Sequence, residues 1–395
     1  MILDQIAWVD CFVFLILLAP QLLLHVGVLD TAICASKALP HLLFVLPFQL
    51  VKERYFTQKD QQSPFVQHAT LFQDVVIRCV RYAFANIPAI IGKVFFSKNV
   101  ALPFMRFRML RHGIWKCPIY WREVKRNNFQ GIYIIDDETR RPDVVVYYCH
   151  GGGFSMGSSY FYMEFLLAWV TLLKEAGYSN PALFALEYTL VPEKTYPTQV
   201  QQTLAGYKYC LYMASDDPKR VCVSGDSAGA TLILSLLLCL SDFAGMRNKL
   251  PGIAIPISPW AAIISSKNKN TPSDYLDEDS LQLYGSQYIG TKASPEDPLV
   301  SPGHCKDVAR WRRASPTLGW FFVYGAEEVF APVAKEMVKL LRETGAQVEV
   351  LEEKGWIHAW PVVKLFLCND QEERLSGLRP MVRFTRERIE PLKLD

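Results

Sequence analysis

The residue with the clearest chemical potential is a serine in a glycine-rich setting. Ser227 is the centre of Gly225-Asp226-Ser227-Ala228-Gly229, which follows a β-branched run and opens an apolar one. This G-x-S-x-G spacing is typical of a strained strand-to-helix turn that exposes the serine hydroxyl. Its small neighbours leave room for the turn, and the N–H of Ala228 would lie at a helix N-terminus. The spacing predicts a nucleophilic serine, with a plain glycine-rich turn as the alternative.

A second glycine-rich segment lies about seventy-five residues before the serine. It reads His150-Gly151-Gly152-Gly153-Phe154 and directly follows another β-branched run. Three successive glycines let the backbone approach a carbonyl group and donate N–H groups to the charge that develops on its oxygen. A flexible loop or a phosphate-binding turn is the alternative, but the Lys-Ser/Thr ending of a phosphate loop is missing. We therefore expect an oxyanion-binding element here.

A serine hydroxyl needs a base to remove its proton and an acid to orient that base. Of the seven histidines, only His358 follows the last predicted strand, which places it last in chain order, as the order serine, acid, histidine requires. The acid should follow the strand before it. Glu328 is the preferred candidate, Glu327 is the runner-up and Asp297 is a distant third.

The elements that must position these residues alternate between strands and helices from about residue 118 onward. Predicted strands are 143–150, 181–188, 220–225, 252–258, 320–325 and 347–353, and predicted helices include 230–246 and 331–346. Unbroken β-branched and aromatic runs are typical of buried parallel strands. The alternation predicts an α/β fold, doubly wound around a mostly parallel central sheet that helices flank.

The first fifty residues are far more apolar than the rest. Residues 11–29 hold nineteen positions without a formal charge when His25 is neutral, which reaches the lower length limit of a membrane-spanning helix. A second stretch, 39–51, is too short to span and contains two prolines. We expect residues 1–51 to form a membrane anchor or a hairpin in one leaflet, with a helix packed on the enzyme as the third interpretation. Basic residues follow the first run, so the positive-inside rule predicts a cytosolic catalytic part.

The next region, residues 52–117, interleaves basic and aromatic side chains. This pattern predicts an amphipathic region resting on a membrane surface, or a helical cap over the active site, and the two are compatible. Residues 118–395 would then form the catalytic domain.

Charge and cysteine usage exclude several functions. The chain has 42 basic and 39 acidic residues, a formal net charge of +3, which argues against a nucleic-acid partner. Its ten cysteines are scattered singly, without a CxxC pair, so neither a metal nor a redox site is expected. Single cysteines inside apolar runs are typical of a reducing compartment. We expect no metal and no organic cofactor.

Together these motifs resemble the hormone-sensitive-lipase-like branch of the α/β-hydrolases. The likeness covers residues 140–365 and includes HGGGF (150–154), YTLVPE (188–193) with Tyr196-Pro197, GDSAG (225–229), Ser258-Pro259-Trp260, Ser301-Pro302 and His358-Ala359. The resemblance implies an α/β-hydrolase fold with an N-terminal helical cap, and oxyanion donors at Gly152, Gly153 and Ala228. In that family a D-x-L tripeptide carries the acid, and the tripeptide that begins at Glu328 matches it with Glu for Asp.

The apolar N-terminus further resembles fungal membrane-anchored esterases, including the steryl deacetylase. The resemblance implies a serine carboxylesterase or lipase that works through an acyl-enzyme on lipophilic esters, such as acetylated sterols or acylglycerols. An acyltransferase with the same triad and a non-catalytic hydrolase-like binding protein are the alternatives. We expect a small-molecule ester substrate, and a membrane or lipid-droplet surface as partner. The expected location is the endoplasmic reticulum or lipid droplets.

Overall fold

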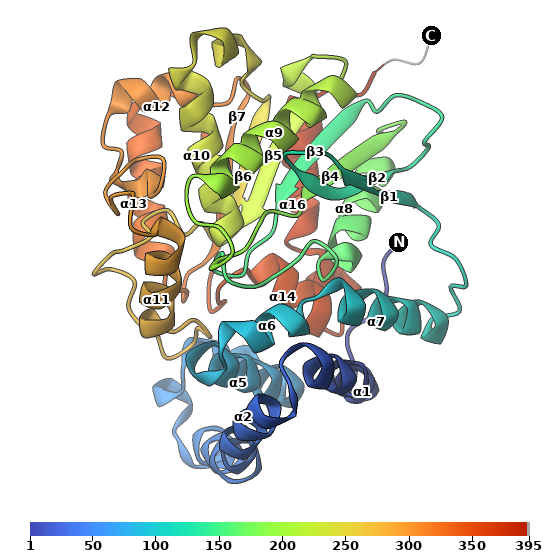
Figure 1. Ribbon diagram of the computed structural model, residues 1–395, viewed down its shortest axis with the longest axis vertical. Coiled ribbons are helices and arrows are strands. Elements are labelled where there is room, and N and C mark those ends of the chain that lie inside the picture. Colours follow the sequence, from blue (N-terminus) through green and yellow to red (C-terminus); the bar gives the residue numbers. More distant parts are fainter. Residues whose placement is uncertain (393–395) are drawn as a thin grey trace.

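The computed structural model describes residues 1–392, and its centre is an eight-stranded sheet (Figure 1). The strands are β1 (Tyr120–Lys125), β2 (Gln130–Ile135), β3 (Val144–Cys149), β4 (Pro181–Leu186), β5 (Val221–Asp226), β6 (Ile253–Ile257), β7 (Gly319–Gly325) and β8 (Val348–Glu353). They lie in the order β1-β2-β4-β3-β5-β6-β7-β8. The six strands from β4 to β8 in this order run parallel, whereas at one edge β2 runs antiparallel to both of its neighbours, β4 and β1. The predicted mostly parallel sheet is confirmed.

The antiparallel edge was not predicted, because its sequence signal is weak. Most residues of β1 are exposed and three of its six side chains are charged, as suits an edge strand. By contrast, every residue of β3, β4 and β5 is buried, which explains why their continuous apolar runs were recognisable.

Helices cover both faces of the sheet and complete two apolar cores. On one face lie α9 (Thr198–Met213), α10 (Ala228–Asp242), α12 (Val308–Ala314) and α13 (Ala331–Glu343); on the other lie α8 (Met163–Glu175), α14 (Trp360–Leu367) and α16 (Leu378–Arg388). Alternate residues of each strand face opposite cores, so Tyr147 packs on the first side and Tyr148 on the second. Two further helices, α11 (Glu278–Ile289) and α15 (Gln371–Leu375), lie in the connections.

The N-terminal residues form a helical layer at one end of the sheet (Figure 1). Its helices are α1 (Trp8–His25), α2 (Val28–Pro40), α3 (Leu46–Val51), α4 (Pro64–His68), α5 (Leu71–Asn86), α6 (Ala89–Phe95) and α7 (Lys98–Arg111). The layer touches loops that leave the carboxyl ends of the strands: Ser158 donates to the Phe96 carbonyl, and Ser280 to that of Phe84. These helices therefore cover the end of the sheet where the predicted site residues lie.

The two apolar stretches differ in detail from the expectation. Gly27, at φ +98°, separates α1 from the next helix. That helix runs without a break through Val28–Phe56, 29 residues, although the sequence suggested that its apolar part is too short to span. It contains two wider turns, His41–Val45 and Lys52–Phe56. By length and composition alone, both helices could cross a membrane.

Candidate active site

Ser227 occupies the sharp turn between β5 and α10, where the backbone is strained. Its φ of +53° lies in the left-handed region, and its N–H donates to the Ile257 carbonyl on the neighbouring strand at 3.0 Å. A Cβ at Gly225 or Gly229 would come within 2.6 Å or 2.0 Å of the Cys149 carbonyl oxygen. The two glycines are therefore required by close backbone packing, and the turn presents a serine at the N-terminus of a helix.

The neighbouring Asp226 fastens this turn to the HGGG segment. Its buried carboxylate accepts hydrogen bonds from the Gly151 N–H at 2.8 Å and from the hydroxyl groups of Tyr148 and Tyr162 at 2.6 and 2.7 Å. Burial raises the pKa of Asp226 to about 6, although the three donors oppose that shift. The segment after β3 and the serine turn after β5 are thus held together by one side chain.

The glycines of the HGGG segment adopt conformations that other residues avoid. Gly152 has φ +112°, and a Cβ there would lie 2.2 Å from the Met156 carbonyl oxygen. Gly153 has φ +61°, with space bounded by the ring of Tyr284 at 3.0 Å. A side chain at Gly152 would force the backbone apart, so the conformation of this loop depends on glycine.

His150 has a structural place in this loop. Its ring stacks on Tyr188 with centroids 4.3 Å apart, and its Nδ1 lies 2.7 Å from the Gly151 carbonyl oxygen. The Tyr188 hydroxyl donates to the His150 carbonyl at 2.9 Å. Burial lowers the pKa of His150 to about 4, so the ring is neutral at pH 7.

His358 and Glu328 lie close together in the loops that follow the carboxyl ends of β7 and β8. The His358 Nδ1 lies 3.9 Å from the Glu328 Oε2, and both side chains are buried. Among the described residues, neither the His358 Nδ1 nor the Glu328 Oε1 has a hydrogen-bond partner. Burial lowers the pKa of His358 to about 3 and raises that of Glu328 far above its ordinary value. Because an unsatisfied buried polar atom is costly, a hydrogen bond between the His358 Nδ1 and the Glu328 carboxyl group would be favourable.

The other candidate acids lie elsewhere. Glu327 is only half-buried, and its backbone, rather than its carboxylate, takes part in the recorded hydrogen bonds, to Trp356 and Thr271. Asp297 accepts the N–H of Leu299 within its own loop. Within residues 1–392, Glu328 is the carboxylate that lies in ion-pair range of the His358 ring.

Two functional residues were not recognised from the sequence. Ser258 appeared only as part of a family motif; its hydroxyl donates to the Glu328 Oε2 at 2.6 Å and accepts the Ala359 N–H at 2.9 Å. Asp274 was not singled out at all. Its buried carboxylate accepts the N–H groups of Val329 at 2.8 Å and His358 at 3.1 Å.

Both residues connect the loop that carries the acid to the loop that carries the histidine. Asp274 lies 84 residues before His358, so no local pattern reveals the contact. Burial raises the pKa of Asp274 to about 6. Ser258 has a positive φ of +44°, an uncommon conformation for a serine that is visible in the structure but not in the sequence.

The predicted residues lie at the carboxyl ends of the parallel strands. Ser227, Glu328 and His358 follow β5, β7 and β8, and the HGGG segment follows β3, which pairs with β5 on the other side. Aromatic rings surround them: Tyr275 and Phe330 lie 5.8 and 5.1 Å from the His358 ring. Ser227 is only 6% exposed, so the site is closed to solvent in this conformation.

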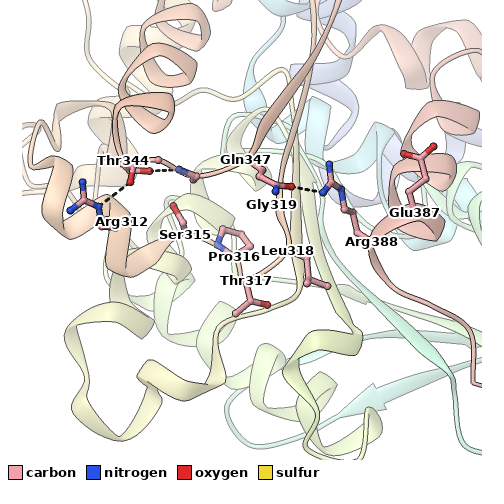
Figure 2. A pocket seen from close by; sticks show the side chains of 12 residues that line it. Arg312, Ser315, Pro316, Thr317, Leu318, Gly319, Thr344, Gln347, Glu387 and Arg388 are labelled. Carbon is pink, nitrogen blue, oxygen red and sulfur yellow. Dashed lines mark hydrogen bonds between the residues drawn. The ribbon is translucent and has the colours of Figure 1, made fainter.

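A second hollow and a metal site were the other possible kinds of functional site. A hollow of about 510 Å³, lined by Arg312, Leu318, Gly319 and Arg388, lies at the amino ends of β7 and β8, away from the serine (Figure 2). Among the described residues, no group of three or more His, Cys, Asp or Glu side chains could hold a metal ion.

Comparison with known proteins agrees with this geometry. A family model described as alpha/beta hydrolase fold matches residues 146–362, more than half of the chain. An acetyl-hydrolase from Streptomyces hygroscopicus is 32% identical over 218 residues, which cover 54% of this chain and 67% of that protein. An esterase of the bacterial hormone-sensitive lipase family superimposes with a TM-score of 0.64 at 22% identity, covering 81% of this chain and 99% of its own. Carboxyl esterase 2 from Tuber melanosporum gives a TM-score of 0.56 at 18% identity, covering 70% and 88%. The chain belongs to the α/β-hydrolase family and is a hydrolase of the carboxylesterase or lipase type.

Proposed function

We propose that the chain is a serine carboxylic-ester hydrolase in which Ser227 is the nucleophile, His358 the base and Glu328 the acid that orients it. The observation that carries the proposal is the placement of the three residues after β5, β7 and β8, with Glu328 in reach of the His358 Nδ1. This is the chain order and spatial logic of a triad on an α/β-hydrolase sheet.

In the proposed reaction, the Ser227 Oγ attacks the ester carbonyl carbon while the Nε2 of His358 takes its proton. The tetrahedral intermediate then expels the alcohol, which receives that proton from the histidine. A water molecule attacks the acyl-enzyme in the same way and releases the acid. Glu328, placed at Nδ1, favours the tautomer in which Nε2 is the free base and stabilises the imidazolium.

The oxyanion would be held by the backbone N–H groups of Gly152, Gly153 and Ala228. Ala228 is the first residue of α10, where unpaired N–H groups and the helix dipole favour negative charge. Each such donor contributes about 3 kcal/mol to lowering the barrier. The Asp226 contact to Gly151 supports this assignment because it holds the two donor segments in a fixed relation.

The proposed substrates are lipophilic esters, such as acetylated sterols or acylglycerols. The burial of Ser227 and the aromatic rings beside His358 favour an uncharged acyl or alcohol group over a charged one. A similar protein is named an acetyl-hydrolase, which supports a short acyl group. We further propose that the enzyme is bound to a membrane or lipid-droplet surface, at the endoplasmic reticulum or on lipid droplets, through its two apolar N-terminal helices.

The test uses purified full-length protein in mild detergent. Hydrolysis of p-nitrophenyl acetate and butyrate is expected. In a separate assay, steryl acetates and acylglycerols are expected to release the free acid. A run with added sterol or long-chain alcohol separates hydrolysis from acyl transfer by its products. Absence of turnover, or transfer to the alcohol in preference to water, would contradict the proposal.

The Gly152→Ala substitution is expected to lower kcat/KM by about 10²-fold or more, because the new Cβ meets the Met156 carbonyl oxygen and displaces an oxyanion donor. The matched control is Gly345→Ala. Gly345 also has a positive φ, +83°, but nothing lies within 4 Å of its Cβ position. The control is expected to lower stability by about 1–2 kcal/mol with kcat/KM unchanged. Equal loss of activity in both variants would contradict the assignment.

The Asp274→Asn substitution is expected to lower kcat by about 10²-fold. The new amide nitrogen is a donor that faces the backbone N–H of Val329 or of His358, so the two donors repel each other and the loop shifts. Asp143→Asn is the control: Asp143 is equally buried and accepts two backbone N–H groups, but at the far end of the sheet. Both variants should lose comparable thermal stability. If kcat falls equally in both, the positioning role of Asp274 is wrong.

A further inference from the structure

The first ten residues are packed on the catalytic domain. Leu3 is 2% exposed, and its carbonyl accepts a hydrogen bond from Arg374. The Ile6 N–H donates to the carbonyl of Phe366, near the end of α14, at 2.8 Å. These residues therefore lie on the same side of any membrane as the catalytic domain.

The start of α1 is joined to the domain by a buried ion cluster. Asp10 and Arg108 are both 0% exposed and 3.0 Å apart, and Arg108 also bonds to Glu164 on α8 at 2.9 Å. Arg111 reaches the same Asp10 oxygen at 2.8 Å. Removing one member would leave an uncompensated buried charge, so the cluster holds α1 firmly against α7 and α8.

The rest of α1 lies along the cap rather than away from it. Phe14 and Leu18, four and eight residues after Asp10, are buried against Val94 of α6 and Val100 of α7. Helix α7 also contains Arg106, Arg108 and Arg111. If α1 crossed a bilayer with these contacts intact, α7 would take its arginines into the hydrocarbon, which is strongly unfavourable.

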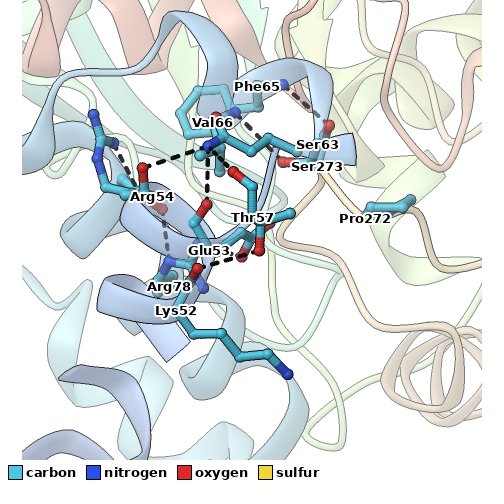
Figure 3. Close-up of polar contacts among 12 residues, drawn as sticks. Lys52, Glu53, Arg54, Thr57, Ser63, Phe65, Val66, Arg78, Pro272 and Ser273 are labelled. Carbon is cyan, nitrogen blue, oxygen red and sulfur yellow. Dashed lines mark hydrogen bonds and ion pairs between the residues drawn. The ribbon is translucent and has the colours of Figure 1, made fainter. Parts of the chain in front are cut away.

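The Val28–Phe56 helix is held in the same way by α5. The ring of His41 stacks on Tyr82 with centroids 4.2 Å apart. At the end of the helix, Arg54 pairs with Asp74 of α5 at 3.1 Å. Glu53 pairs with Arg78 of the same helix at 2.6 Å (Figure 3). This helix also lies alongside a charged helix of the cap, so it too is unsuited to cross a bilayer.

The opposite faces of these helices are apolar and exposed. Examples are Phe12 (64% exposed), Leu15 (60%) and Leu24 (75%) on α1, and Leu43 (60%), Phe44 (72%) and Phe48 (68%) on the second helix. Neither 11–29 nor 38–51 contains Asp, Glu, Lys or Arg. A face of this kind inserts in the plane of a leaflet.

The adjoining cap supplies a matching charge. Residues 75–122 contain nine Lys and Arg residues and neither Asp nor Glu. Arg106 and Lys116 are exposed on this stretch and lie in no ion pair with another described residue, whereas Lys98 and Arg111 pair with Glu123 and Asp10. A basic border beside an apolar face is complementary to anionic lipid headgroups.

We infer that α1 and the Val28–Phe56 helix insert side-on into one leaflet of an anionic membrane, with residues 1–10 and the catalytic domain on the same side. Neither helix spans the membrane. This inference rests on the proposed membrane association. It favours helices that lie within one leaflet over an anchor that spans the membrane. It places the cap that covers Ser227 at the lipid surface, from which a lipophilic ester enters.

The topology is tested by adding single cysteines and counting the extra adducts of a membrane-impermeant PEG-maleimide, applied from each side of the membrane in turn. The sites are Asp4→Cys near the N-terminus, Val28→Cys at the turn between the helices and Glu138→Cys in the catalytic domain, all exposed. Asp4→Cys and Glu138→Cys are expected to react from the same side. Val28→Cys is expected to react from neither side until detergent dissolves the membrane.

Each contrary result has a distinct meaning. Reaction of Asp4→Cys and Glu138→Cys from opposite sides would establish a single span, and reaction of Val28→Cys from the far side would establish two spans; either overturns the inference. Recovery of the protein in the soluble fraction would overturn the proposed membrane association itself, whereas the esterase assay is independent of both.

The lipid face is tested by flotation with vesicles of phosphatidylcholine alone or with 30% phosphatidylserine. The double variant Phe44→Glu/Phe48→Glu is expected to lose at least tenfold in vesicle binding, and wild type to prefer the anionic vesicles. Tyr212→Glu, which changes a 73% exposed aromatic on α9, is the control and should bind normally. A wild-type dimer that the double variant abolishes, without vesicle binding, would show that a second copy covers this face and would contradict the inference.

Discussion

Replacing Ser227 with alanine is expected to lower kcat for p-nitrophenyl butyrate by about 10⁶-fold, as loss of the nucleophile does in other triad hydrolases. The hydroxyl is the group that forms the acyl-enzyme, and the oxyanion donors alone retain only a small residual rate. Alanine fits the same turn, since the serine already has φ +53° and is small. The folded state should therefore be preserved, with a melting temperature near that of wild type.

Ser235→Ala is the matched control for this experiment. Ser235 is also a buried serine of α10, but its hydroxyl donates to the Thr231 carbonyl one turn earlier. Its replacement should leave kcat within about twofold of wild type, because it touches no reacting group. More than about 1% residual activity in Ser227→Ala would place the nucleophile elsewhere.

Glu328→Gln is expected to lower kcat by about 10⁴-fold, the effect of replacing a triad carboxylate with its amide. The amide is nearly isosteric and its oxygen can still accept from Ser258 and Gly325, as the Glu328 Oε2 does at 2.6 and 3.1 Å. Unlike the Glu328 carboxyl group, the amide cannot take up a negative charge when the imidazolium forms, and it fails to select the tautomer with a free Nε2. The loss should therefore appear in kcat, with little change in stability.

Glu327→Gln provides the comparison, because Glu327 precedes the acid and was its closest rival. Its side chain is half-buried and lies outside ion-pair range of His358. The variant should keep kcat within about threefold of wild type. The reverse pattern, with Glu327→Gln inactive and Glu328→Gln active, would transfer the role to the neighbouring residue.

The positions of the strands and of the motif residues were predictable because their signals are local. A buried parallel strand is a continuous apolar run. Glycine marks the strand-to-helix turn because a Cβ at Gly229 would come within 2.0 Å of the Cys149 carbonyl oxygen. The order of Ser227, Glu328 and His358 then followed from the order of the strands. The choice of Glu328 over Glu327 remains a prediction until the variants are measured.

The remaining features depend on contacts between distant parts of the chain. The Asp274 carboxylate meets a backbone N–H 84 residues later, and Arg108 meets Asp10 across 98 residues. No periodicity records such pairs, and an isolated Asp or Arg in the sequence is as compatible with a solvated surface as with a buried cluster. The same holds for the N-terminal helices, whose apolar composition can be read locally, whereas their packing against the cap depends on distant residues.

The most direct test of the central claim is covalent labelling by a fluorophosphonate, followed by peptide mapping. This reagent phosphonylates a serine only when a base and an oxyanion site activate it. Labelling of wild type in membranes at the peptide that contains Ser227, lost in Ser227→Ala and retained in Ser235→Ala, is the expected result. Labelling that survives Ser227→Ala, or that maps to another serine, would contradict the assignment of Ser227 as the nucleophile.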